Sequence, residues 1–455
     1  IQEKYLMAQR LKWNFKNIWA KNLRFPYKKH HQFIETGDIT IYKLPKKMYT
    51  TVMKRIFFLL SLIFILTCLS CASSNSTSSE LFFPSNFMKG IDISMVNQLE
   101  NQGGEFYTSA GTKKDIYSIL KESGANWIRV RLWVNPDQYE RGNLPYPQGM
   151  NNLAAVKKMI QDSKAKEMKV LLDFHYSDTW AHPGQQYIPL DWKNISLGKE
   201  MADKLASYTT DVLQNLIDSG CTPDMVQVGN EVTDGILSDR EYNMEHLNLY
   251  LQAGCNAVKA VDENILVMIH IDRGGNKALV QNWFAKYAKN CDYDVIGLSW
   301  YPFYNSHGTL QGLQENIAYL KSTTGKQVVT VETSYPWTEE WKDNSPNSVG
   351  NDNLYAAYWQ LKNQGKTPKG IKIKTDSSGA KYIPATIPNQ EAVFKAVIEA
   401  TIQGGGSGVF YWGGEWISVN KDDYGSMGSS WENQALFDFE GKALPALELY
   451  SLETK

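Results

Sequence analysis

Short apolar stretches rich in valine, isoleucine and leucine recur along the chain, and longer segments with a helical pattern separate them. Each stretch is five to eight residues long, which suits a buried strand better than a helix. Polar residues and glycines bound most of them. Eight stretches are therefore predicted as strands: 88–93, 127–133, 169–175, 225–231, 265–272, 295–300, 327–333 and 408–412.

The segments between these stretches show the period of helices that are packed on one side. Residues 112–123 open with a Thr112/Asp115 capping pattern and then repeat apolar residues on one face. Residues 151–167 and a segment starting near Ser196 show the same period. Regular alternation of strand and helix predicts a parallel sheet, and eight units favour an α/β fold of the (β/α)8 TIM barrel type. An open doubly wound sheet is the alternative.

The longest interval between strands follows the seventh, between residues 333 and 408. It contains a predicted helix at 354–363, a hairpin at 370–382 and a helix at 389–403. Loops at the C-terminal ends of barrel strands surround the functional site of such folds. We therefore expect this enlarged loop to form a wall of a cleft in a single domain.

The beginning of the chain has the features of a targeting segment. Met53-Lys54-Arg55 precedes the apolar run 56–66, which is too short to span a membrane but suits a signal peptide. A cysteine and a serine-rich stretch follow, as in bacterial lipoproteins. The pattern predicts a non-mature segment 1–52, a lipoprotein signal peptide 53–71 with lipidation at Cys71, a polar tether 72–86 and a folded domain 87–455. We expect export and anchoring at the outer membrane or cell surface, with secretion as the alternative.

Composition narrows the class of partner. The net charge is −1, with 47 basic and 48 acidic residues, so neither nucleic acid nor an anionic membrane surface is expected as a partner. The 14 tryptophans and 25 tyrosines suit a sugar ligand, because sugar rings stack on aromatic faces. Three cysteines follow Cys71, namely Cys221, Cys255 and Cys291, and an odd number cannot all pair internally. Free buried thiols are therefore expected. A monomer is taken as the default state.

Polar and aromatic residues gather where the predicted strands end. In a barrel these ends converge on one mouth, so the gathering favours a functional site. The residues concerned are Asp92, Arg131, Trp133, Asp173, His175, Glu231, His270, Asp272, Trp300, Tyr301, Glu332 and Trp412.

Glu231 ends the fourth predicted strand, and Glu332 lies in the seventh, one residue before its end. Carboxyl groups roughly 5 Å apart are the geometry of a retaining glycosidase, in which one is the acid/base and the other the nucleophile. Glu231 is the predicted acid/base, with Asn230 on the sugar 2-hydroxyl, and Glu332 the predicted nucleophile. We expect Arg131 and Tyr301 to keep Glu332 ionised.

Several strings of the chain, taken together, resemble glycoside hydrolase family 53. They are GIDIS at 90–94, RVRLW at 129–133, DFHYSDTWA at 173–181, QVGNE at 227–231, GLSWYPF at 297–303 and ETSYP at 332–336. The resemblance runs from about residue 89 to the C-terminus. It implies a secreted arabinogalactan endo-β-1,4-galactanase with a (β/α)8 barrel and a retaining mechanism, acting on galactan through the same two glutamates.

The resemblance also implies which residues line the galactose subsites: Asp92, Arg131, His175, Asp178, Trp180, Asn230, His270, Tyr301 and Trp412. Trp133, at a strand end, and Trp337, at the start of the enlarged loop, are further candidates. The chain departs from the family pattern at Trp300, where tyrosine is expected, and after Trp412, where Gly-Gly-Glu-Trp stands in place of Glu-Pro-Ala-Trp.

Other functions remain open at this stage. The two carboxylates do not encode the sugar, so a related endo-glycosidase acting on β-mannan or β-glucan is one alternative. A surface lipoprotein that binds glycans without cutting them is another. Catalysis is expected to need no cofactor, since the histidines lack metal-site spacing. A structural calcium ion near Asp343, Ser345 and Asn347 is a further possibility.

Overall fold

The computed structural model describes residues 81–138, 140–141, 144–145, 149–239, 243–343, 345–419 and 429–455. The predicted upstream segment, the signal peptide with Cys71 and residues 72–80 of the tether lie outside the described residues. Residues 80–455 form one compact unit of the chain.

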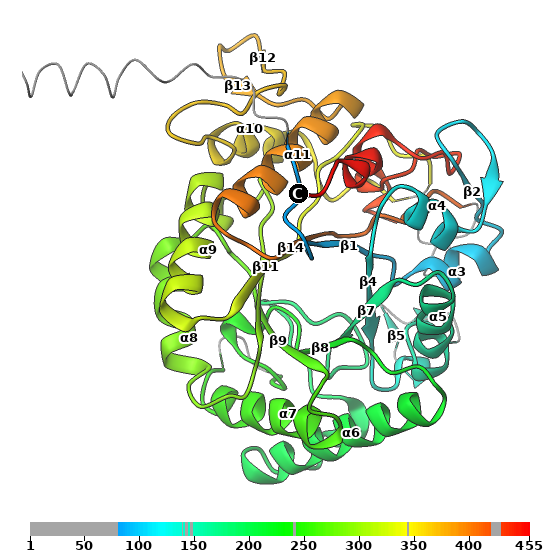
Figure 1. Cartoon of the computed structure of the whole chain (residues 1–455), viewed down its shortest axis with the longest axis vertical. Helices are drawn as coiled ribbons and strands as arrows, with labels where there is room; N and C mark the ends of the chain where they lie inside the picture. The colour runs from blue at the N-terminus through cyan, green and yellow to red at the C-terminus, as the bar shows by residue number, and fades with distance from the viewer. Residues whose placement is uncertain are drawn as a thin grey trace, which may run out of the picture. The chain divides into compact units, whose positions relative to one another are not determined.

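Eight parallel strands of the described residues close a barrel, which confirms the predicted fold and excludes the open sheet (Figure 1). Each strand pairs with its neighbours along the chain, and the last pairs with the first. Their order is β1 (Met88–Asp92), β4 (Trp127–Leu132), β7 (Lys169–Phe174), β8 (Met225–Val228), β9 (Leu266–Ile271), β10 (Val295–Ser299), β11 (Gln327–Glu332) and β14 (Gly408–Tyr411).

Helices surround the barrel (Figure 1). They are α3 (Val96–Asn101), α4 (Ile116–Glu122), α5 (Leu153–Ala165), α6 (Lys199–Asp218), α7 (Leu247–Val261), α8 (Lys277–Tyr287), α9 (Leu310–Thr324), α10 (Asn351–Gln360) and α11 (Ile387–Gln403). Short 3-10 helices lie at Pro136–Gln138, Leu190–Trp192, Val232–Asp234, Asn305–His307, Glu432–Gln434 and Pro445–Ser451. Three two-stranded hairpins complete the described elements: β2 (Phe106–Tyr107) with β3 (Lys113–Lys114), β5 (Glu140–Arg141) with β6 (Leu144–Pro145), and β12 (Lys374–Thr375) with β13 (Lys381–Tyr382).

The start of α4 differs from the predicted helix at 112–123. The N-cap is Asp115, whose side chain accepts a hydrogen bond from the Ser118 backbone N–H at 2.8 Å. The residues before it extend as β3 and pair with β2, so Thr112 is not part of the cap.

The interior of the barrel changes from apolar to polar along its axis. Side chains that alternate inward from the strands form an apolar cluster near the strand starts, including Met88, Trp127, Met268 and Phe410. Gly90 leaves room for the ring of Phe410, because a Cβ there would lie 2.1 Å from a ring carbon. The next inward residues along the strands are charged or polar, and they lead to the C-terminal mouth.

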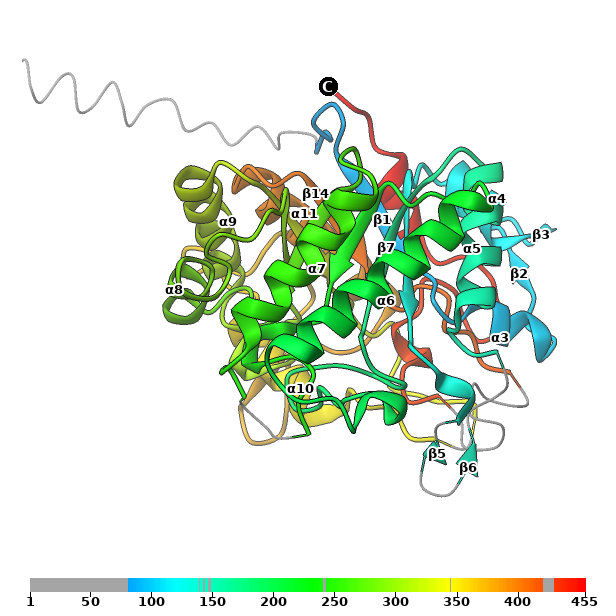
Figure 2. The same ribbon diagram turned by 90° about the horizontal axis from the view of Figure 1, so that it is seen from below.

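The segment after β11 builds on that mouth. Figure 2 shows α10 and the β5–β6 hairpin at the same end of the barrel, with the C-terminus at the other end. Asn353 at the start of α10 donates a hydrogen bond to the carbonyl of Phe303, and the Tyr335 hydroxyl donates one to the carbonyl of Ile383. The predicted helix, hairpin and helix of this segment are confirmed as α10, β12–β13 and α11, with α10 beginning three residues earlier than predicted.

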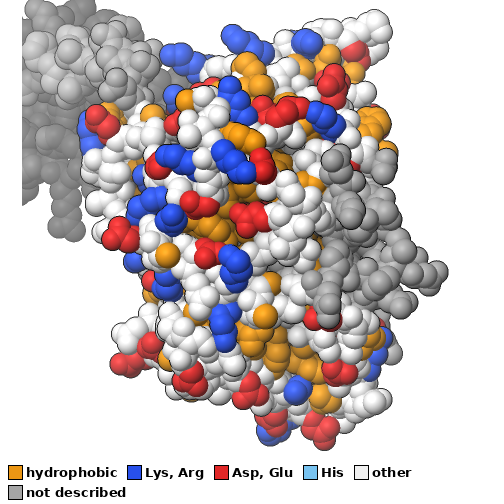
Figure 3. Space-filling view, turned by 90° about the vertical axis from the view of Figure 1, so that its right-hand side faces the viewer, with side chains coloured by type: hydrophobic (Ala, Val, Ile, Leu, Met, Phe, Trp, Pro, Cys, Tyr) orange, Lys and Arg blue, Asp and Glu red, His pale blue; other side chains and the backbone are white. Residues whose placement is uncertain are grey.

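The face over α3, α4 and α5 carries basic and acidic side chains interspersed with one another (Figure 3). Ion pairs such as Lys114–Glu122 and Lys158–Asp162 explain part of this mixing. This face therefore offers no basic patch for a polyanion. Within the described part of the chain, none of the helices has both the length and the apolar character to cross a bilayer.

Candidate active site

Glu332 reaches the barrel interior through an irregularity in β11. Along the β10–β11 pair, Leu298 lies opposite Thr330 and Ser299 lies opposite Glu332, so Val331 is an extra residue, as in a β-bulge. Val329 and Val331 both belong to the interior cluster. Without the bulge, alternation would turn Glu332 outward, on the side of Val328 and Thr330. With it, the Glu332 carboxylate faces the mouth of the barrel.

Glu231 sits on a tight turn just beyond β8. Gly229 has φ of +81°, and a Cβ there would lie 2.6 Å from a Val232 methyl carbon. Glu231 itself is in the left-handed region with φ of 45° and ψ of 50°, a costly conformation for a non-glycine residue. Its backbone N–H donates to Nδ1 of His270 at 3.3 Å. The turn thus fixes the direction of a 9%-exposed carboxyl group at the strand end.

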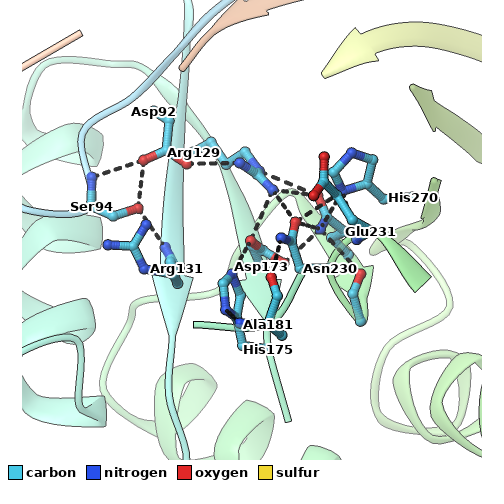
Figure 4. A network of polar contacts seen from close by, with 12 residues as sticks. Asp92, Ser94, Arg129, Arg131, Asp173, His175, Ala181, Asn230, Glu231 and His270 are labelled. Carbon is cyan, nitrogen blue, oxygen red and sulfur yellow. Dashed lines mark hydrogen bonds and ion pairs between the residues drawn. The ribbon is translucent and has the colours of Figure 1, made fainter. Parts of the chain in front are cut away.

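One arginine, Arg129, connects the charged groups below the mouth (Figure 4). Its guanidinium lies 2.7 Å from Glu332, 2.8 Å from Asp92 and 2.9 Å from Asp173. It also donates to Oδ1 of Asn230 at 2.9 Å. The arginine and its three carboxylate partners are each at most 5% exposed. Three carboxylates on one guanidinium leave this cluster with excess negative charge.

The partners of His175 define its tautomer. Nδ1 of His175 accepts N–H groups from the Ala181 backbone at 2.9 Å and the Trp133 indole at 3.3 Å. Nε2 must then carry the proton that it donates to Asp173 at 3.1 Å. Burial lowers the pKa of His175, which fits a neutral ring. His175 therefore orients Asp173, which in turn binds Arg129.

The two glutamates differ in their surroundings. Burial, the charge of Glu332 and that of Asp272 raise the pKa of Glu231 well above its usual range. Burial also raises the pKa of Glu332, but Arg129 and a hydrogen bond from Tyr301 oppose this rise. That bond runs from the Tyr301 hydroxyl to Oε2 of Glu332 at 2.9 Å. These surroundings favour the protonated form of Glu231, whereas Arg129 and Tyr301 favour the ionised form of Glu332.

A cleft of about 590 Å³ opens above the two carboxyl groups. Aromatic side chains form much of its wall: Trp180, Tyr301, Phe303, Tyr304, Trp412 and Trp431. Trp412 contacts Trp431 edge to face, with 5.2 Å between ring centroids, and lies 6.2 Å from Trp180. Such a wall presents ring faces and a few polar groups, as sugar sites do.

Eight of the residues with a predicted catalytic or substrate-binding role line this cleft: Glu231, Glu332, Arg131, His175, Trp180, Asn230, Tyr301 and Trp412. Five others, Asp92, Trp133, Asp178, His270 and Trp337, are not among the described residues that line it.

Four of these five lie behind the wall and support residues that line the cleft or shape its loops. Asp92 binds Arg129, His270 holds the turn at Glu231, and the indole N–H of Trp133 donates to His175. Asp178 accepts the backbone N–H groups of residues 135 and 190 and borders a separate cavity of about 310 Å³.

Trp337 lies partly buried in the enlarged loop. Its ring packs on Phe439, with 4.6 Å between centroids, and its indole N–H donates to the carbonyl of Glu432. The structure therefore gives this tryptophan contacts within the loop wall.

The expectation that Arg131 pairs with Glu332 is wrong. The guanidinium of Arg131 lies 3.8 Å from the ring centroid of Trp180 and donates to Asn151 at 3.1 Å. Arg129 and Arg131 point to the same side of β4, but Arg129 lies one layer deeper, at the level of Glu332. Arg129 is thus the main residue that the sequence interpretation missed.

Asp272 is among the strand-end residues of the expected site, but no catalytic or binding role was predicted for it. It ends the β9 region, lines the cleft and is held by Thr233 at 2.5 Å and by Arg273 at 2.9 Å. Trp431 also lines the cleft. It lies well beyond the end of the last strand, so the strand pattern gave no reason to place it at the site.

The loops after β11 and β14 contain the residues considered for calcium. Asp343 accepts the backbone N–H groups of Ser345 and Ser429, and the hydroxyls of Ser345 and Ser430 lie 2.9 Å apart. Three buried oxygens of these loops have no hydrogen-bond partner among the described residues: Oδ1 of Asn347, Oε2 of Glu432 and Oδ1 of Asn433. No cluster of three or more His, Cys, Asp or Glu residues suited to a metal occurs in the described ranges.

Comparison with known proteins identifies similar chains. The sequence profile of glycosyl hydrolase family 53 matches residues 88–368 and 354–450. The endo-β-1,4-galactanase of Bacillus subtilis (strain 168) is 33% identical over 400 residues, covering 80% of this chain and 85% of the relative. The arabinogalactan endo-β-1,4-galactanase of Cellvibrio japonicus (strain Ueda107) is 34% identical over 382 residues, covering 81% and 91%. A solved structure, the Ignisphaera aggregans GH53 catalytic domain, aligns with a TM-score of 0.71 at 32% identity, covering 83% of this chain and 99% of that one.

Proposed function

Since the chain belongs to glycosyl hydrolase family 53, we propose that it is an endo-acting galactanase that hydrolyses β-1,4-galactosidic linkages in galactan and type I arabinogalactan. The observation that carries this proposal is the pair of buried glutamates at the mouth of the barrel, one with a raised pKa and one bound by Arg129 and Tyr301. The names of the two bacterial relatives supply the substrate class.

The mechanism follows from the protonation of the pair. Glu332 attacks the anomeric carbon from one face of the sugar, and Glu231 gives its proton to the departing glycosidic oxygen. The product of this step is a glycosyl-enzyme ester on Glu332. Glu231, now ionised, takes a proton from water, and the resulting hydroxide equivalent releases the sugar with retained configuration. Both carboxyl groups then regain their starting charge.

The surrounding residues assist at defined points. Arg129 and Tyr301 each hold one oxygen of Glu332 and so orient the carboxylate for attack. Asn230, whose amide is fixed by Arg129 and by the Ala181 carbonyl at 2.8 Å, borders the cleft beside Glu231, where a sugar 2-hydroxyl is expected. Trp412 and Trp180 supply ring faces for stacking.

A panel of polysaccharides tests the proposal against its alternatives. The purified chain from residue 81 onward, with Glu332→Gln beside it, is incubated with β-1,4-galactan, β-mannan and mixed β-glucan, and products are separated by size. Oligosaccharides from galactan alone, lost in the variant, are expected. Products from mannan or glucan would assign the related endo-glycosidase, and retention of galactan without cleavage would assign the glycan-binding lipoprotein.

We also propose that the loops after β11 and β14 can bind calcium as a structural ion, while catalysis itself needs no cofactor. The unpartnered oxygens of Asn347, Glu432 and Asn433 are hard ligands of the kind that calcium prefers. Asp343 would add charge, although both its oxygens already accept backbone N–H groups. A melting temperature that rises with added calcium in the wild type but not in Glu432→Gln is expected, and equal curves with calcium and chelator would refute it.

Export with a lipid anchor at Cys71 is likewise proposed from the sequence, since the apolar run and the serine-rich stretch after it suit a lipoprotein. Metabolic labelling with a fatty-acid analogue in a bacterial host should mark the wild type and not Cys71→Ala. Label in both proteins, or in neither, would contradict the anchor and favour secretion.

A further inference from the structure

Two of the three described cysteines, Cys255 and Cys291, lie against each other on the outside of the barrel. Cys255 is buried on α7, and Cys291 is partly exposed between α8 and β10. Their thiols lie close enough to interact, which raises the pKa of Cys255 and lowers that of Cys291. The third cysteine, Cys221, is fully buried and donates instead to the carbonyl of Ser219 at 3.4 Å.

The contact between the two segments extends over one face of α7. Asn248, Gln252 and Cys255 are spaced four and three residues apart, so they share that face. The Asn248 amide donates to the carbonyls of Tyr287 and Lys289 and lies 3.7 Å from the sulfur of Cys291. Gln252 donates to the Lys289 carbonyl at 3.3 Å. These contacts fix the segment that carries Cys291 on the face that carries Cys255.

From this juxtaposition we propose that Cys255 and Cys291 are a redox modification site, which a low-molecular-weight disulfide such as oxidised glutathione converts into an intramolecular disulfide. The odd cysteine count first suggested that all three thiols stay free. In the structure, Cys255 and Cys291 form a contacting pair and Cys221 is isolated. An odd number of cysteines is therefore compatible with one disulfide and one free thiol.

The reaction has a defined order. Cys291 is the accessible thiol, and its contact with Cys255 lowers its pKa. As a thiolate it attacks the oxidant, forms a mixed disulfide and releases one glutathione thiolate. Cys255, whose pKa is raised by its contact with Cys291 and by burial, then loses its proton and attacks the Cys291 sulfur. The second glutathione leaves, so two thiols have given two electrons and two protons to one oxidised glutathione.

The site lies away from the proposed chemistry. Cys291 precedes β10, which begins at Val295, so it is near the N-terminal end of the strands, opposite the mouth that carries Glu231 and Glu332. In barrels of this kind the N-terminal end contributes stability rather than catalysis. The disulfide would link α7 to the entry of β10 and should raise the melting temperature without changing the turnover number.

Mass spectrometry of the folded protein with oxidised glutathione tests the proposal. The wild type and a Cys221→Ser control should lose two hydrogens and yield a peptide pair joined through Cys255 and Cys291. Cys255→Ser should stop at one glutathione adduct on Cys291, and Cys291→Ser should leave Cys255 unmodified.

A wild type that keeps its thiols, or that ends as a stable glutathione adduct, would overturn the proposal. So would adduct formation at Cys255 in Cys291→Ser. The wild-type result decides the question even if a variant fails to fold. As a second readout, the oxidised wild type should melt at a higher temperature than the same sample after dithiothreitol.

Discussion

The replacement Tyr301→Phe isolates one hydrogen bond to the proposed nucleophile. The Tyr301 hydroxyl donates to Glu332 at 2.9 Å, and the two residues are 7% and 5% exposed. Phenylalanine keeps the ring and its contacts, such as the edge-to-face packing on Trp412 at 6.4 Å. The variant therefore removes a donor with little loss of packing.

The expected magnitude follows from the charge and burial of that bond. A hydrogen bond to a charged buried group contributes about 1.5–3 kcal/mol. At about 1.36 kcal/mol per pKa unit, its loss should raise the pKa of Glu332 by about 1–2 units. Glu332 must be ionised to attack, so activity is present above its pKa and is lost as the pH falls through that pKa. Because the variant has the higher pKa, it loses activity at a higher pH than the wild type. The acid limb of the pH profile should move to higher pH by the same amount.

The assay is kcat/KM for galactan hydrolysis across pH, beside Tyr176→Phe as the control. Tyr176 is also buried, but its hydroxyl lies 2.8 Å from the hydroxyl of Thr209 on α6 rather than near a carboxylate. A fall of about 10- to 100-fold below the shifted limb is expected for Tyr301→Phe, from the same hydrogen-bond energy. An unshifted limb, or a shift of equal size in the control, would refute the reasoning.

Three further replacements have defined outcomes. Glu231→Gln should lower galactan hydrolysis by about 10²–10⁴-fold and spare the first step on aryl galactosides with good leaving groups, measured as a burst of released phenol; equal loss on both substrates would contradict its role as acid. Arg129→Lys cannot reach three carboxylates with one ammonium group, so it should destabilise the fold by about 3–5 kcal/mol in urea unfolding, and an unchanged midpoint would contradict the network. Gly229→Ala should cost about 1–3 kcal/mol, because it combines φ of +81° with a clash at Val232, and wild-type stability would show that the turn relaxes freely.

The barrel could be predicted because parallel strands covered by helices are buried on both faces and so are continuously apolar. The stretch at 169–175, for example, became β7 (Lys169–Phe174) with one residue of difference. Helix boundaries that depend on a side-chain cap were harder to predict from the sequence. Both Thr112 and Asp115 could cap a helix, and the choice of Asp115 depended on the pairing of β3 with β2.

The choice between Arg129 and Arg131 could not be made from the sequence. The two residues are separated by one position, so both point to the same side of β4, and either could meet a carboxylate at the mouth. The decision depends on depth along the barrel axis. Register brings Arg129 opposite Asp92, whereas Arg131 reaches the level of Trp180 and stacks there. The depth of a side chain along the barrel axis depends on the register of all eight strands. The sequence pattern of a single strand therefore does not predict it.

The direction of Glu332 depends on the same kind of non-local information. Alternation along β11 places Val328 and Thr330 outward, where the Thr330 hydroxyl lies 2.8 Å from that of Thr401 on α11. An unbroken alternation would send Glu332 the same way and leave Arg129 facing two carboxylates instead of three. The bulge at Val331 turns Glu332 inward instead, and the residue type at position 331 does not predict a bulge. The bulge is therefore what brings the Glu332 carboxylate within reach of both Arg129 and Tyr301.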